Sequence, residues 1–248
     1  MLETYAALDR GTTHRNTVSF DSIFGDTPSS PGPRNTLPPR LRLEIANDKT
    51  WLQASVVALI HRMYASRGLQ THLDTKHPPG HCITLAARED RDVLGTLSLR
   101  IDGEHGLLAD QLYRSEIDSI RNAGGVVCEA TRLALQPQPN AQGLLAMLFN
   151  AAFVIARSAH RCTDLIMECH PRHANYYQRM LACDRIGAPA ICPRVGAPAV
   201  LLHLSLEQAE HRIARHHGGE MRTAKDLYRH SLSPQAQRTL YQTLLAQH

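Results

Sequence analysis

The chain has 248 residues, of which 43% are hydrophobic and 20% are charged, and its formal net charge is +4. This length suits one large α/β domain with extensions, whose core needs no disulfide or metal to stabilise it. The mildly positive charge fits an acidic partner surface, but it is far below that of a dedicated nucleic-acid binder. We therefore expect a globular protein that binds no nucleic acid.

Cysteine spacing argues against a metal-binding protein, and hydropathy argues against an exported or membrane-spanning one. None of the six cysteines forms a Cys-x-x-Cys pair, so we expect reduced thiols and no metal site. The first 20 residues contain no apolar targeting segment. The most apolar stretch, residues 143–156, is shorter than a bilayer-spanning helix. These features predict a cytoplasmic protein without a transmembrane segment.

Periodicity and turn residues predict the elements in chain order. Residues 1–39 are rich in proline and are expected to form a flexible leader. Alternation and helical spacing then predict a strand at 40–45, a helix at 49–66 capped by Asn47 or Asp48, strands at 81–88 and 93–101 joined as a hairpin, a helix at 109–122, a strand at 126–135, a long apolar helix at 141–159, a strand at 164–168, a helix at 171–181, strands at 186–191 and 197–204, and a helical tail at 207–248.

This order predicts an α/β fold in which a mixed sheet carries helices on both faces. We expect three parts: the leader at 1–39, a catalytic domain at 40–206 and a helical C-terminal extension at 207–248.

The strand at 126–135 is the most informative, because charged side chains interrupt an apolar run. Glu129 and Arg132 lie three residues apart, and such positions face opposite sides of a strand unless a bulge intervenes. Burying either charge without a partner destabilises the fold. Either both side chains reach solvent or pair elsewhere, or Glu129 is a partly buried base whose surroundings set its pKa.

The sequence Glu-Ala-Thr-Arg at residues 129–132 resembles the Glu-x-Ser/Thr-Arg motif of the acyl-homoserine lactone synthases and of their relatives, the long-chain N-acyl amino acid synthases. Residues 95–102, 107–113 and 170–177 also resemble segments of these synthases, and the resemblance covers residues 40–206. It implies a GNAT-like three-layer fold with a mixed, mostly antiparallel central sheet. It also implies that acyl groups come from acyl carrier protein.

The segment that begins at His170 is similar to a second GNAT element, in which an Asn-led helix carries a tyrosine seven residues on. His170 stands in place of the asparagine, and Tyr177 falls at the tyrosine position. The resemblance implies that Tyr177 protonates the departing thiolate. The alternative is that Tyr176 and Tyr177 are packing residues with hydrated hydroxyls.

Two departures from the patterns of related enzymes favour a carrier protein as the acyl donor and an amino acid as the acceptor. GNAT enzymes that use coenzyme A have a glycine-rich loop whose amides hold the pyrophosphate. Residues 137–143 have two prolines and one glycine, which favours acyl-phosphopantetheine of a carrier protein as donor and no bound cofactor. The lactone synthases carry N-terminal Arg, Phe, Trp and paired Asp residues. Here Arg62 and Asp74 are present but the only tryptophan is Trp51, which favours an amino acid over S-adenosylmethionine as acceptor.

The resemblance also implies which further side chains bind substrate and carrier. The substrate-binding candidates are Thr131, Arg62, Arg100 and Asp102. Carrier proteins are acidic, and a basic region follows the long helix, so the carrier-docking candidates are Arg157, Arg161, Arg172 and Arg179. The alternative for this basic region is a solvated face.

The predicted function is that of an acyltransferase, which moves a long-chain fatty acyl group from acyl carrier protein to the amino group of an amino acid. Glu129 would take a proton from the ammonium, Tyr177 would protonate the leaving thiol, and Arg132 would orient Glu129 or bind the acceptor carboxylate. Three alternatives remain open: a lactone synthase that uses S-adenosylmethionine, a coenzyme A-dependent N-acetyltransferase, and a non-enzymatic module that binds an acyl carrier or lipid.

Overall fold

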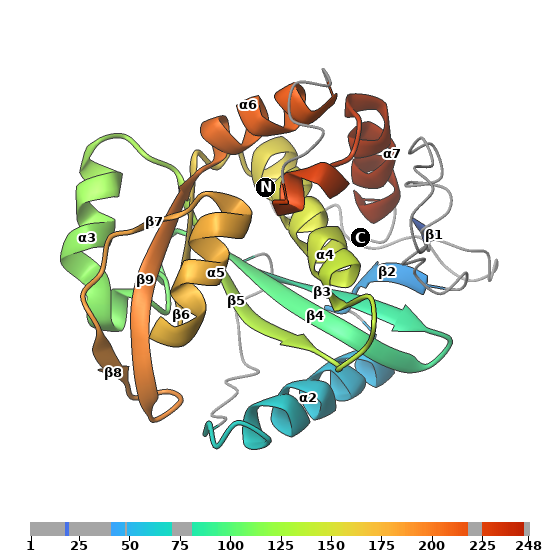
Figure 1. Ribbon diagram of the computed structural model, residues 1–248, viewed down its shortest axis with the longest axis horizontal. Helices are drawn as coiled ribbons and strands as arrows, with labels where there is room; N and C mark the ends of the chain where they lie inside the picture. Colours follow the sequence, from blue (N-terminus) through green and yellow to red (C-terminus); the bar gives the residue numbers. More distant parts are fainter. Residues whose placement is uncertain (1–17, 20–40, 48, 71–80, 218–224, 246–248) are drawn as a thin grey trace, which may run out of the picture.

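The computed structural model describes residues 18–19, 41–47, 49–70, 81–217 and 225–245 (Figure 1). The strands are β1 (Val18–Ser19), β2 (Leu41–Ile45), β3 (Cys82–Glu89), β4 (Asp92–Ile101), β5 (Val127–Leu135), β6 (Asp164–Cys169), β7 (Asp184–Arg185), β8 (Ala190–Cys192) and β9 (Ala197–Ser205). The helices are α2 (Thr50–Ala65), α3 (Asp110–Asn122), α4 (Ala141–Val154), α5 (Pro171–Leu181), α6 (Leu206–His217) and α7 (Pro234–Leu245), with a π-helical turn η1 (Ile155–Ala159) and a 3₁₀ turn η2 (Leu227–His230).

The strands form one sheet in the order β1-β2-β3-β4-β5-β6-β9-β7, and β8 pairs with β9. Every pairing is antiparallel except that of β5 with β6. The predicted hairpin is confirmed as β3 and β4, with Asp90 in its turn at φ 49°. The expected mixed, mostly antiparallel sheet is therefore present.

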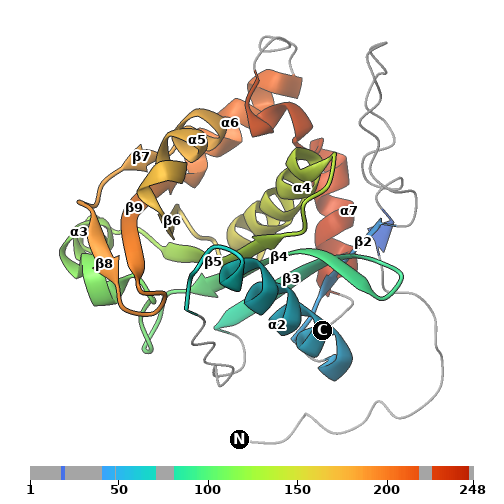
Figure 2. The same cartoon turned by 60° about the horizontal axis from the view of Figure 1, so that its bottom comes forward.

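Helices cover both faces of this sheet, as expected. On one face, α2 packs against Ala86 and Val93 of the hairpin, and α3 packs against Val127 and Ile166. On the other face, α4 packs in the main core, which also holds Leu97 of β4. Figures 1 and 2 show α4, α6 and α7 together on this second face. Layers of helix, sheet and helix result, because each strand alternates its apolar side chains between the two faces.

The predicted apolar helix is confirmed, and Asn140 caps it by accepting a hydrogen bond from the N–H of Gly143. It continues through η1, so the helical segment Ala141–Ala159 has 19 residues and, by length and composition alone, reaches the size of a membrane span. The shorter stretch 143–156 had suggested that this helix is too short to span a membrane. The full length of the helical segment does not support that argument. However, 67% of its apolar window is buried inside the protein, as in the central helix of a folded core.

Two local predictions are wrong. Asn47 does not cap α2: its amide donates to the carbonyl of Cys82 and accepts from the N–H of Thr84, so it joins the end of β3 instead. Asp48, the other capping candidate, lies outside the described residues. Of the expected strand at 186–191, only the end is a strand, in β8. β7 ends at Arg185, and the N–H groups of Ile186 and Gly187 that follow it both donate to the carbonyl of Leu201.

The two ends of the chain join the same structure. Within the expected leader, Val18 and Ser19 pair with Leu43 and Arg42 of β2, and the rest of the leader lies outside the described residues. In the C-terminal extension, apolar side chains pack into the main core beside α4; these are Ala209, Ile213, Leu227, Tyr228, Leu232, Leu240 and Leu244. The division of the chain at residue 207 stays a prediction.

Candidate active site

The site lies where the two central strands separate. The parallel pairing of β5 with β6 has three register pairs and ends at Glu129 and Ile166. Both strands continue beyond this point, to Leu135 and Cys169. Figure 1 shows the two halves of the sheet diverging, with β4 and β5 on one side and β6 and β9 on the other. A cavity opens in the gap between them.

The bulge that the spacing of Glu129 and Arg132 required is present in β5. Ser98 pairs with Thr131 and Thr96 with Ala134, so two residues of β5 oppose one residue of β4. Arg132 takes the extra position with φ 54°. This left-handed conformation is uncommon outside glycine and is found where function favours it. The bulge changes the direction of the strand, and Glu129, Thr131 and Arg132 all line the same cavity.

The cavity has a volume of about 380 Å³ and passes through the gap in the sheet. On the α2 side, its lining includes Tyr64 and Arg67. On the α4 side, its lining includes Phe149 and Tyr177. A polar ligand and an apolar ligand can therefore meet between the strands from opposite faces.

Glu129 is the most deeply buried acid of the cavity, with 1% of its surface exposed. Its Oε2 accepts a hydrogen bond of 2.6 Å from the N–H of Leu108. Burial raises the pKa of Glu129 to about 7, although this hydrogen bond and the cation of Arg194 act in the opposite direction. A carboxyl group with this pKa exchanges a proton near neutral pH, which suits a general base.

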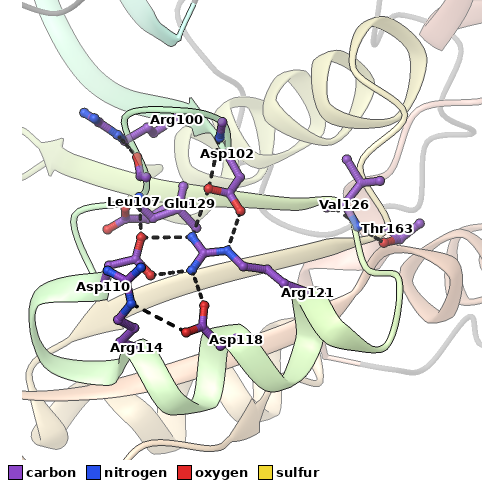
Figure 3. A network of polar contacts seen from close by, with 12 residues as sticks. Arg100, Asp102, Leu107, Asp110, Arg114, Asp118, Arg121, Val126, Glu129 and Thr163 are labelled. Atoms are coloured by element: carbon purple, nitrogen blue, oxygen red, sulfur yellow. Dashed lines mark hydrogen bonds and ion pairs between the residues drawn. The ribbon is translucent and has the colours of Figure 1, made fainter.

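A network of ion pairs holds the loop that contacts Glu129 (Figure 3). Arg121 of α3 donates to Asp102 at 2.7 and 2.9 Å, and to Asp110 at 2.7 and 2.9 Å. Asp110 in turn accepts from the N–H of Leu107, next to Leu108. Arg100 lies opposite Glu129 in the β4–β5 ladder and donates to the carbonyl of Gly106. These contacts fix the backbone donor that faces the Glu129 carboxylate.

Glu168 and Arg194 form an ion pair in the lining of the cavity. Glu168 was not predicted from the sequence as a site residue. Arg194 also donates to the carbonyl of Leu108 at 2.7 Å. The Glu168 side chain is 10% exposed. Its second oxygen, Oε1, is buried without a hydrogen-bond partner among the described residues. An unsatisfied carboxylate oxygen in a cavity favours a ligand that donates hydrogen bonds.

Tyr177 lies on α5, as predicted, and lines the α4 side of the cavity. The helix begins at His170, whose Nδ1 accepts from the N–H of Arg172, so His170 serves as the N-cap. Burial raises the pKa of Tyr177, and its ring contacts those of Phe149 and Tyr176. The hydroxyl therefore keeps its proton at neutral pH and can give it to a stronger base.

The structure separates the predicted substrate-binding residues. Thr131 lines the cavity. Arg100 is 7% exposed and supports the loop below Glu129, so it contributes from behind the site. Asp102 is bound to Arg121, and Arg62 is exposed on α2. Asp74 lies outside the described residues.

The structure also separates the predicted carrier-docking residues. Arg172 and Arg179 are exposed on α5, next to the openings of the site. Arg157 and Arg161 lie at or beyond the far end of the α4–η1 helix, and Arg157 is bound to the Cys162 carbonyl and Glu210. We therefore retain the two α5 residues as candidates for binding the carrier. Among the described residues, no cluster of three or more His, Cys, Asp or Glu side chains is placed to hold a metal ion.

Solved structures with a similar fold are acyltransferases. FeeM, an N-acyl amino acid synthase from uncultured soil microbes, aligns with a TM-score of 0.63 and 22% identity over 70% of this chain and 96% of that chain. An acyl-CoA N-acyltransferase from Pseudomonas aeruginosa aligns with a TM-score of 0.48 and 15% identity over 66% of this chain and 98% of that chain. The AHL synthase LasI aligns with a TM-score of 0.42 and 12% identity over 67% of this chain and 89% of that chain. No curated protein matches the chain significantly.

The fold is GNAT-like, and its central sheet is opened between β5 and β6. The family model of the N-acyl amino acid synthase FeeM matches residues 55–205, which contain β3 to β9 and the whole cavity lining. The chain therefore belongs to the FeeM N-acyl amino acid synthase family, and it is an N-acyltransferase. The resemblance found in the sequence is confirmed.

Proposed function

We propose that this enzyme moves a long-chain fatty acyl group from acyl carrier protein to the amino group of an amino acid, in the cytoplasm, where the carrier is charged. The observation that carries this proposal is Glu129, a buried carboxylate at the point where β5 and β6 separate, with a pKa raised to about 7. N-acylation requires such a base, because an ammonium must lose a proton before its nitrogen can attack.

The acceptor site lies on the α2 side of the cavity, where the charged groups gather. Glu168 receives the ammonium through its unsatisfied Oε1. Arg132, and Arg67 at the end of α2, face the same cavity and suit the acceptor carboxylate, since a guanidinium binds carboxylates in a bidentate manner. Burial raises the pKa of Tyr64, and the charges of Arg132 and Arg67 act in the opposite direction, so both cations act on its hydroxyl. One zwitterionic amino acid can satisfy both kinds of charge.

The donor site lies on the α4 side, where the lining is apolar. Leu97, Phe149 and Met167 offer surface to an acyl chain. A second apolar cavity shares Phe149 and continues among Phe153, Leu165, Leu204 and Leu227. The second cavity is small, about 40 Å³, so a long acyl chain would have to pass Phe149 and widen it. Each methylene buried there contributes about 0.8 kcal/mol.

The reaction follows from these positions. Glu129 takes one proton from the ammonium, and the free amine attacks the thioester carbonyl carbon. The C–N bond forms and the C–S bond breaks as the tetrahedral intermediate collapses. Tyr177 passes a proton to the departing sulfur as it accepts the second amine proton from the nitrogen, so the hydroxyl is kept and no phenolate forms. The products are an N-acyl amino acid, a free carrier thiol and one proton on Glu129.

The test is mass spectrometry of lipid extracts from cells that express the wild type, Glu129→Gln or Glu207→Gln. Glu207 is 79% exposed on α6 and serves as the matched control. We expect new long-chain N-acyl amino acids from the wild type and the control, and at least 100-fold less from Glu129→Gln.

The same extracts distinguish the alternatives. Lactones with methylthioadenosine would indicate a lactone synthase. Full product formation by a folded Glu129→Gln variant would contradict the role of Glu129, and no acyl amide from well-expressed wild type would contradict the synthase proposal.

A further inference from the structure

A second cleft adjoins the active-site cavity on the α4–α5 side of the sheet. It is bordered by the first turn of α4, by α5 and by the residues before η2. His173 and Tyr177 line both the cleft and the cavity. These two residues are four apart on α5 and so lie on one face of the helix. A slender molecule in the cleft can therefore reach the thioester position beside Tyr177.

Three cationic side chains line this outer cleft: Arg179 of α5, Lys225, and Arg229 of η2. All three are exposed. Arg229 donates to the Gln142 side chain at 3.1 Å, which holds its guanidinium at the start of α4. Among the described residues that line the cleft, the one acid is Asp226, which is 8% exposed and lies 2.9 Å from the His216 ring nitrogen. The outer cleft is therefore positive.

Most of the backbone N–H groups at the start of α4 already have an acceptor within the protein. The N–H of Ala141 donates to the carbonyl of Gln138, and the N–H of Gly143 donates to the Asn140 side chain. The N–H of Leu144 donates to the Asn140 carbonyl. These amides are the ones that hold phosphate at helix N-termini in other folds. Side chains must therefore supply most of the contacts to a phosphate in the cleft.

We propose that Arg179, Lys225 and Arg229 form the binding site for the phosphate of the carrier's phosphopantetheine arm. This inference rests on the proposed function. Lys225 and Arg229 lie in the C-terminal extension, outside the family match at residues 55–205. The loop before α4 contains prolines and offers few backbone N–H groups to a phosphate. The extension completes the donor site with cationic side chains instead. Guanidinium and ammonium groups bind phosphate through charge-assisted hydrogen bonds.

Equilibrium binding tests this site without relying on catalysis. The probes are S-decyl thioethers of phosphopantetheine, of pantetheine and of coenzyme A, which cannot transfer an acyl group. They are titrated against the full-length wild type, Lys225→Gln, Arg229→Gln and the double variant. Arg238→Gln is the control, because Arg238 is an exposed arginine on α7, in the same extension.

We expect the wild type and the control to bind the phosphopantetheine probe more tightly than the pantetheine probe, by at least tenfold. The double variant should lose about tenfold of this preference while its affinity for the pantetheine probe stays unchanged. An unchanged preference in the double variant, or no preference in the wild type, overturns the site. Tighter binding of the coenzyme A probe than of phosphopantetheine would keep the phosphate site but contradict the carrier as donor.

Activity then separates this inference from the function on which it rests. Acyl-phosphopantetheine and acyl-pantetheine are offered with a mixture of amino acids, and acyl amides are measured by mass spectrometry. If neither donor yields an amide with the wild type, the proposed function fails, whereas the titrations still decide the phosphate site.

Discussion

The N–H of Leu108 donates to the carboxylate of Glu129 across 2.6 Å and joins a loop after β4 to the centre of the sheet. Arg121 supports that loop through Asp102 and Asp110. Because the hydrogen bond lowers the pKa of Glu129 and burial raises it, the rigidity of this loop helps to set the pH at which the base works.

The first prediction concerns the pH dependence of the reaction. Glu129 must be ionised to act as a base, so kcat/KM should rise with pH through an acidic limb near pH 7. Arg121→Met should move this limb to higher pH, since a loosened loop weakens the donor that stabilises the carboxylate. Rate profiles from pH 5 to 9 measure both. Arg114→Met on the same helix is the control, and equal profiles for Arg121→Met and wild type would contradict the role of the loop.

The second prediction concerns stability. The folded protein holds a proton on Glu129 up to about pH 7, whereas the unfolded chain loses it near its ordinary value of 4.5. The wild type should therefore lose stability as the pH rises from 5 to 8, relative to Glu129→Gln, by on the order of 3 kcal/mol. Urea unfolding at both pH values measures the difference. If the difference in unfolding free energy between the wild type and Glu129→Gln is the same at pH 5 and pH 8, Glu129 is ionised in the folded protein over this whole range.

The third prediction concerns the leaving group. Tyr177→Phe should lower kcat by about tenfold with little effect on the donor KM, because a thiolate already leaves readily without a proton. Tyr176→Phe, the neighbouring tyrosine on α5, should retain wild-type kcat. A donor with a more acidic thiol should restore the rate of Tyr177→Phe. Equal losses in both tyrosine variants would indicate packing rather than proton transfer.

The fourth prediction concerns the acceptor ammonium. Glu168→Gln should raise the acceptor KM roughly tenfold, because the charged hydrogen bond from the ammonium is weakened. The inhibition constant of the same acid without its amino group should not change, and this comparison separates ammonium binding from general damage to the Glu168–Arg194 pair. Glu104→Gln, an exposed acid after β4, is the control.

The fifth prediction concerns acyl-chain length. Phe149 lies between the active-site cavity and the apolar cavity behind it. Phe149→Leu should open the path and shift the products toward longer acyl chains, as measured by the masses of the amides formed. Phe153 lines only the second apolar cavity, so Phe153→Leu should leave the amounts of the shorter N-acyl products unchanged. A product distribution that is the same in the wild type and Phe149→Leu would place the acyl chain elsewhere.

Most of the fold was predictable because its elements have regular periods. Leu41, Leu43 and Ile45 alternate in β2, and α4 is apolar over its whole length. The strand at 186–191 was wrong because Gly187 lies against the ring of Tyr113, where an added Cβ would come within 2.7 Å of that ring. Such a close approach depends on a partner 74 residues away, which local periodicity does not reveal.

The site was only partly predictable, for a similar reason. Glu129 and Arg132 stood out because charges interrupt an apolar strand, and a bulge was needed for them to share a site. Glu168 gave no such signal: it is the next-to-last residue of β6, and its importance comes from Arg194, which reaches it from the loop after β8. The outer cleft escaped prediction because Lys225 belongs to a segment outside the resemblance.

The early end of the β5–β6 pairing has a consequence for how the protein avoids unwanted association. Beyond Glu129 and Ile166, the two strands no longer pair with each other, so each presents an edge toward the cavity. An open edge on the outside of a protein is a template for aggregation. Here both edges are enclosed between α2, α4 and α5. The helices that line the cavity therefore cover the unpaired strand edges, so the opening that admits substrates is not an exposed template for another chain.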